Sequence, residues 1–112
     1  MESCLYRYEF EPHVRLETLE SALLLTFWAA ESLHGEIQVQ LDFAYYLDAE
    51  SRLCVIDAST DVGVDACRLF LGFLKREFGP DCFRVERLNQ PARSWPLKRG
   101  SRDAEVSAGM QA

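Results

Sequence analysis

The sequence predicts an α+β fold of the ferredoxin-like type, in which a four-stranded antiparallel sheet carries two helices on one face. Two observations carry this prediction. The expected elements follow the order β-α-β-β-α-β, and the third expected strand is apolar on both sides, as a central strand is. Two β-α-β halves in this order interleave into such a sheet. The main alternative is a simple meander with the helices packed elsewhere.

The first strand and the first helix are the clearest elements. A strand is expected over residues 4–11, where Tyr6, Tyr8 and Phe10 alternate with polar residues. A long helix is expected over residues 14–34. Its apolar stripe recurs at spacings of three and four and consists of Leu16, Leu19, Leu23, Phe27 and Ala30.

The remaining elements follow from the same two periodicities. Residues 36–47 alternate between apolar and polar side chains, which predicts the second strand. A short polar turn separates them from the third strand, residues 52–57. The second helix is expected over residues 61–78, and the last strand over residues 82–88.

The chain has 112 residues, of which 48% are hydrophobic and 27% charged, and this composition is typical of one globular domain. We expect that domain to occupy residues 1–89. Residues 90–112 lack an apolar period and are expected to form a disordered basic tail. Deleting the chain from Pro91 onward should then leave the melting temperature nearly unchanged.

The charge distribution argues against nucleic acid as a partner. Residues 1–88 contain eight Lys or Arg and sixteen Asp or Glu, a net charge of −8. Phosphate backbones are bound by Lys and Arg, so an acidic body repels them. No apolar run is long enough to span a membrane, and we expect no secretory signal at the start.

The four cysteines show no C-x-x-C spacing that would indicate a zinc or redox site. Cys4, Cys54, Cys67 and Cys82 all lie within apolar stretches, so we expect buried and reduced thiols. Together with the lack of a signal, this predicts a cytoplasmic protein. No cofactor and no metal are expected.

The loop between the third strand and the second helix is the candidate ligand site. Asp57, Ser59, Thr60 and Asp61 could hold a small ligand or a divalent cation, because carboxylates and hydroxyls suit Mg²⁺ and Ca²⁺. The simpler interpretation is helix capping, with Ser59 or Thr60 as the N-cap and Asp61 in the first turn. Capping accounts for each of these residues except Asp57.

Two histidines could contribute to chemistry. Glu31 and His34 have the Glu-x-x-His spacing of di-iron helix bundles, but such centres need a second copy of it and two more glutamates. His13 could act as a general base only beside a nucleophile. Cys54 is the thiol considered for that role, and its apolar neighbours disfavour the reactive thiolate.

The first helix carries more apolar surface than one stripe requires. Leu24, Leu25 and Trp28 lie beside the stripe, so the middle of the helix is apolar nearly all round. A helix of this kind is usually covered, either by the neighbouring helix or by a partner. These three residues are therefore the candidate interface.

The open face of the sheet is a second candidate surface, through which two chains could pair. Its expected side chains are Leu5, Arg7, Glu9 and Glu11 from the first strand, Gln38, Gln40, Asp42 and Tyr46 from the second, and Arg84 and Glu86 from the last. Trp95, flanked by Arg93 and Lys98 in the tail, could dock onto an acidic body.

These observations favour a non-enzymatic interaction or regulatory module. It is expected to form a homodimer or to bind a protein partner, and to bind neither nucleic acid nor membrane. The alternative is a small ligand-binding or divalent-cation-binding protein, or an enzyme, with its site at the Asp57–Asp61 loop.

Overall fold

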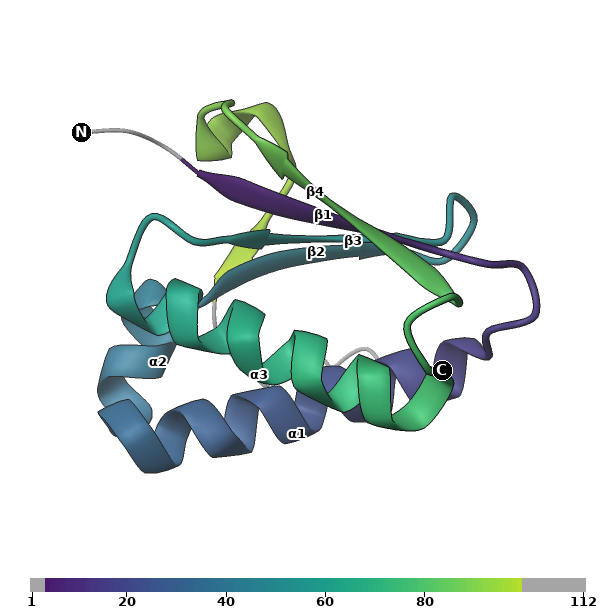
Figure 1. Cartoon of the computed structure of the whole chain (residues 1–112). Coiled ribbons are helices and arrows are strands. Elements are labelled where there is room, and N and C mark those ends of the chain that lie inside the picture. Colours follow the sequence, from purple (N-terminus) through teal and green to yellow (C-terminus); the bar gives the residue numbers. More distant parts are fainter. Residues whose placement is uncertain (1–3, 100–112) are drawn as a thin grey trace, which may run out of the picture.

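Helices and strands are interspersed along residues 4–99, the part of the chain that the computed structural model describes (Figure 1). In chain order the elements are β1 (Leu5–Phe10), α1 (Leu16–His34), α2 (Glu36–Asp42), β2 (Ala44–Asp48), β3 (Leu53–Asp57), α3 (Asp61–Phe78), β4 (Phe83–Leu88), the 3₁₀ turn η1 (Ala92–Ser94) and β5 (Lys98–Arg99). The predicted α+β class is confirmed. The second predicted helix, residues 61–78, has the bounds of α3.

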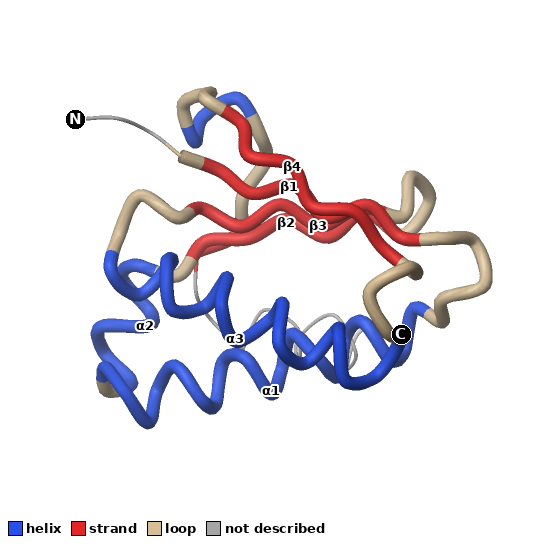
Figure 2. The backbone as a smooth tube through the Cα atoms, in the orientation of Figure 1, coloured by secondary structure: helices blue, strands red, loops and turns tan. Residues whose placement is uncertain are grey.

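The strands form one antiparallel sheet in the order β4-β1-β3-β2-β5, in which β5 contributes only two residues. The apolar strand β3 lies between β1 and β2, as its composition predicts. Strand β1 pairs with β4 along its whole length, from Leu5 opposite Leu88 to Phe10 opposite Phe83. Helices α1 and α3 lie on one face of the sheet (Figure 2).

Aromatic side chains join the helices to that face. Phe27 of α1 stacks on Phe43, the residue before β2, with ring centroids 4.4 Å apart, and meets the ring of Tyr45 in β2 edge-on, with centroids 6.0 Å apart. Phe70 of α3 meets the ring of Tyr8 edge-on, with centroids 4.9 Å apart. Since Tyr8, Phe27, Phe43 and Phe70 are all fully buried, these contacts anchor each helix on the sheet.

The prediction of a strand over residues 36–47 is wrong for its first half. Residues 36–42 form α2, and only Ala44–Asp48 is a strand. In this helix Val39 is buried, whereas Ile37 and Leu41 stand one turn apart and are 74% and 59% exposed. Gln38, Gln40 and Asp42 therefore lie on a helix and not on the open face of the sheet. In a short segment rich in Glu, Gln and Leu, alternation of polar and apolar side chains is compatible with a strand or with a helix.

The disordered tail expected from residue 90 is likewise wrong as far as residue 99. This segment contains η1, and it returns to the sheet as β5, where Lys98 pairs with Tyr45. Trp95 and Leu97 pack against Leu5, Val55 and Leu88 on the face that the helices leave open. Residues 100–112 of the predicted tail lie outside the described residues.

Candidate functional site: the outer face of α1

The outer face of α1 is formed by Leu24, Leu25 and Trp28, the three residues expected to form an interface. Leu25 and Trp28 are 46% and 47% exposed, and Leu24 is half-buried. Spacings of three and four place all three side chains on one side of the helix. Leu23 and Phe27 of the same helix are fully buried.

A groove between α1 and α3 borders this face. It has a volume of about 180 Å³, and its lining includes Leu25 of α1 and Phe73 of α3. The other residues that line it are Thr18, Ser21, Ala22, Arg76 and Glu77. Helix α3 therefore reaches only one flank of the outer face, and within the described chain Trp28 keeps nearly half its surface open.

Acidic residues bracket the outer face along the helix. Glu20 lies one turn before Leu24, and Glu31 lies one turn after Trp28. Glu17 adds a further exposed carboxylate one turn earlier, where Arg15 contacts it at 3.0 Å. The face is thus apolar at its centre and negative at both ends.

The loop from Asp57 to Asp61 has the hydrogen bonds of a helix cap. The Oδ1 atom of Asp57, a buried residue, accepts bonds from the Ser59 N–H at 2.9 Å and from the Ser59 hydroxyl at 2.6 Å. Thr60 is the N-cap of α3, and its Oγ1 accepts a bond from the Gly63 N–H at 3.0 Å. The same hydroxyl donates to the Asp42 carbonyl. Asp61 is exposed in the first turn.

No metal-ligand cluster accompanies this loop. Within residues 4–99 no three side chains of His, Cys, Asp or Glu come close enough together to hold a metal ion. The structure accounts for the buried carboxylate of Asp57, which the capping interpretation left without a role, because this carboxylate holds Ser59 at the start of the turn.

The two histidines each have a partner that the sequence did not predict. His34 Nε2 lies 2.8 Å from Asp65 Oδ2, which ties the end of α1 to the first turns of α3. His13 Nε2 lies 3.5 Å from the sulfur of Cys82, not beside Cys54, which is buried in β3. The Cys82 thiol also lies 2.9 Å from the Phe78 carbonyl, to which it donates its proton.

All four cysteines are free, but their burial divides them into two pairs. Cys54 and Cys67 are buried, whereas Cys4 and Cys82 are half-buried. Burial raises the pKa of the Cys67 thiol from 9.0 to about 12. It also raises the pKa of Tyr8, whose hydroxyl donates to the Cys67 carbonyl at 3.3 Å.

These shifts predict that the protein loses stability in alkali. The unfolded chain releases the Cys67 proton from about pH 9, whereas the folded chain retains it until about pH 12. The folded state binds more protons in this window, so the free energy of unfolding falls as the pH rises, by up to about 1.4 kcal/mol per pH unit for such a group. Urea titrations between pH 8 and pH 11 measure this slope. Cys67→Ala should make it shallower, and an unchanged slope would contradict the assignment to Cys67.

Within the described residues, no helix combines the length and the apolar character needed to cross a membrane. Comparisons of the chain with protein-family models, with curated proteins and with solved structures found no match. The case for a function therefore depends on the chain's own surfaces, among which the sequence singled out the outer face of α1.

Proposed function

We propose that this chain is a non-enzymatic interaction module that binds another protein through the outer face of α1. The observation that carries the proposal is the exposure of Leu25 and Trp28, at 46% and 47%, on a helix whose other apolar side chains are mostly packed. Contiguous apolar surface of this kind marks partner sites, and Trp is enriched among the residues that dominate binding energy.

The acidic ends of the face define the chemistry of the partner. Glu20 and Glu31 favour a segment that has apolar side chains at its centre and Lys or Arg at its flanks. An amphipathic helix with a basic border meets both requirements. The net charge of −8 over residues 1–88 disfavours nucleic acid, and four free thiols fit the reducing cytoplasm.

Two further points support a module without catalysis. The strand order β4-β1-β3-β2, with α1 and α3 as the crossovers, supports a ferredoxin-like architecture, which is a scaffold shared by many binding domains. The alternative site at Asp57–Asp61 gains no such support, since Ser59 and Thr60 already have hydrogen-bond partners. That alternative predicts that Mg²⁺ shifts the amide resonances of residues 57–65, whereas our proposal predicts no change there.

The fluorescence of Trp28 tests the proposal directly. In a Trp95→Phe background, Trp28 is the one remaining tryptophan. Its emission should shift to the blue on titration with an amphipathic helical peptide of Leu and Lys, because binding removes the exposed ring from water. A peptide of the same pattern with Glu in place of Lys should leave the emission unchanged.

Two serine variants locate the binding surface. Leu25→Ser should weaken the binding of the Leu–Lys peptide about fivefold or more. The matched control is Leu33→Ser, which removes a 63% exposed leucine from the same helix outside the outer face and should bind like the parent. Equal binding of both peptides, or equal weakening by both variants, would contradict the proposal.

A further inference from the structure

Strand β4 forms an open edge of the sheet. It pairs with β1 on one side, and among the described residues no strand lies on its other side (Figure 1). Its four central residues, 84–87, are all exposed. Such an edge presents free N–H and C=O groups, which can pair with a further strand.

The backbone register shows which residues offer those groups. The Glu11 N–H donates to the Cys82 carbonyl at 3.0 Å, so the backbone N–H and C=O groups of Cys82 point toward the chain of β1. Backbone groups alternate sides along a strand. Residues 84, 86 and 88 therefore also bond to β1, and Phe83, Val85 and Arg87 direct their N–H and C=O groups outward.

The helix layer leaves an apolar groove open along this edge. The groove has a volume of about 230 Å³ and lies between α3 and the two strands β1 and β4. It is lined by Tyr6, Tyr8, Val64, Cys67, Arg68, Leu71 and Val85. Val85 is 40% exposed although its side chain lies on the helix side of the sheet, where it forms part of the wall of this groove.

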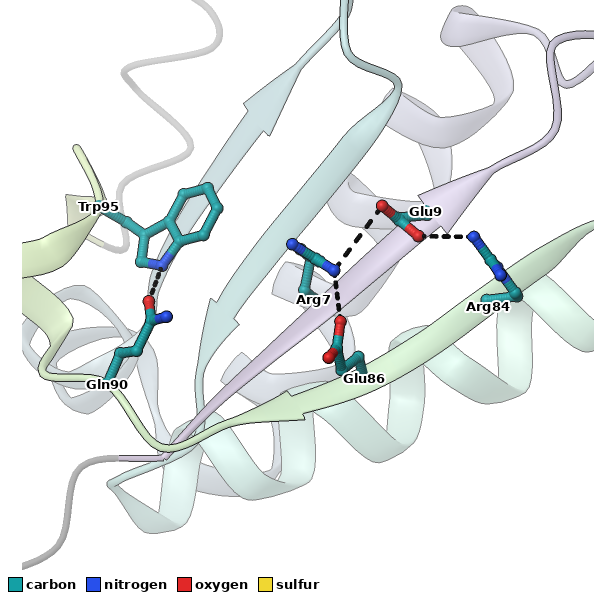
Figure 3. A network of polar contacts seen from close by, with 6 residues as sticks. All are labelled: Arg7, Glu9, Arg84, Glu86, Gln90 and Trp95. Atoms are coloured by element: carbon teal, nitrogen blue, oxygen red, sulfur yellow. Dashed lines mark hydrogen bonds and ion pairs between the residues drawn. The ribbon is translucent and has the colours of Figure 1, made fainter.

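The opposite face of β4 carries charges of alternating sign. Arg84 contacts Glu9 at 3.1 Å, and Glu86 contacts Arg7, so both charges on this face of β4 already have an opposite charge beside them on β1 (Figure 3). The β4 side chains remain largely exposed, at 86% for Arg84 and 58% for Glu86. They can therefore meet a second set of charges on the outer side.

We propose that a second copy of this chain pairs with β4 through its own β4, antiparallel and centred on Val85. In this register the two Val85 residues face each other and exchange backbone hydrogen bonds. Phe83 of each copy likewise exchanges backbone hydrogen bonds with Arg87 of the other copy, which gives about six hydrogen bonds in all. The two sheets become one continuous sheet with all the helices on one side, and the two apolar grooves meet at the twofold axis.

The charges select this register. Arg84 of each copy lies opposite Glu86 of the other, at a pair position where side chains approach most closely. A ladder of alternating sign then runs from Glu9 through Arg84 and on to Glu86 and Arg7 of the second copy. A register centred on residue 84 would oppose two arginines, and one centred on residue 86 would oppose two glutamates.

This self-association surface lies apart from the outer face of α1, which stays free for another protein. Neither of the surfaces considered from sequence for a homodimer, the first helix and the open sheet face, is used. The two proposals can therefore fail separately. Trp28→Ser should leave the dimer intact while it abolishes binding of the Leu–Lys peptide.

The first test removes one outward N–H group. Wild-type protein at about 100 μM should sediment with twice the 12.8 kDa mass of the chain. Val85→Pro should sediment as a monomer, because proline cannot donate to the second copy and is tolerated where the N–H faces solvent. Val85→Thr is the matched control, since it keeps the N–H and the β-branch, and it should remain dimeric. Circular dichroism verifies that each variant is folded.

The second test exchanges the charges. Arg84→Glu and Glu86→Arg should each weaken self-association about tenfold or more, because like charges then face each other twice. The exposed intrachain ion pairs that they break contribute little to folding. Mixed together, the two variants should form a heterodimer, in which every pair at positions 84 and 86 is again of opposite charge.

Three results would overturn the proposal. One is a wild-type protein that sediments as a monomer at about 100 μM. Another is a folded Val85→Pro variant, or an Arg84→Glu variant, that dimerises as wild type does. The third is a mixture of the two charge variants that stays monomeric.

Discussion

Ending the chain at Asn89 is expected to lower the free energy of unfolding by about 2–4 kcal/mol. The truncation removes Trp95, Leu97 and β5, and thereby exposes Leu5 and Val55, which are fully buried in the intact protein. For a domain of this size the melting temperature should drop by roughly 10 °C or more. Thermal unfolding followed by circular dichroism measures the difference, and this outcome is the opposite of the one that the sequence predicts for the tail.

A pair of tryptophan variants separates packing from the loss of chain. Trp95→Ala should cost about 1–3 kcal/mol, since the indole packs on Tyr46 with ring centroids 6.2 Å apart and donates to Gln90 at 3.0 Å. Trp28→Ala truncates a ring that is 47% exposed and should cost much less. Equal melting temperatures for the two variants would show that Trp95 does not cover the sheet.

Replacing Gly63 by alanine is expected to destabilise the protein by about 2–3 kcal/mol. Gly63 is buried in the first turn of α3, where the helix lies directly on the end of β3. A Cβ atom at this position would overlap the carbonyl oxygen of Asp57 and would also press on Ala58. Both obstacles are backbone atoms, so relief requires the helix to move away from the sheet.

Gly72 provides the matched control in the same helix. A Cβ atom there meets nothing within 4 Å, so Gly72→Ala should stabilise the protein by about 0.5–1 kcal/mol through helix propensity alone. The same substitution at two positions of α3 is thus expected to change the free energy of unfolding in opposite directions. Urea titrations of both variants would contradict the close approach of α3 to β3 if both came out more stable than wild type.

The elements with a long apolar period were predictable from sequence. Helix α3 has six buried residues within eighteen and a Thr60 cap, and its predicted bounds agree with the structure. Strand β3 is apolar on both sides and is central in the sheet. In both cases local pattern and tertiary burial favour the same structure, so the local pattern is a reliable guide.

The failures have a common physical cause, which is that short segments take their structure from what they pack against. Residues 36–42 alternate between polar and apolar side chains, as in a strand. They form α2 instead, in which Val39 is buried and Ile37 is exposed. Trp95 lies in a segment without any period and is held by Tyr46 and Leu5, residues about fifty and ninety positions earlier. No local signal reports such distant contacts.

The candidate sites likewise divide into features that local periodicity predicts and features that depend on distant contacts. The side of α1 that carries Leu25 and Trp28 follows from helical spacing, and their exposure agrees with it. The open edge at Val85 could not be deduced from the sequence, because the order of strands decides which one lies outermost. The approach of Cys82 to His13 depends on two loops whose course no periodicity specifies.

The pairing of β1 with β4 has a consequence for the synthesis of the protein. Leu5 lies opposite Leu88, so β1 leaves the ribosome about eighty residues before β4, the strand that covers this edge. Until then β1 can pair only with β3, through contacts such as Tyr8 opposite Cys54. Contacts this distant in sequence slow folding, and half-made sheets aggregate. We therefore expect chaperones to shield the nascent chain from aggregation until residue 88 has emerged. We also expect the finished protein to refold more slowly than a helical bundle of equal length.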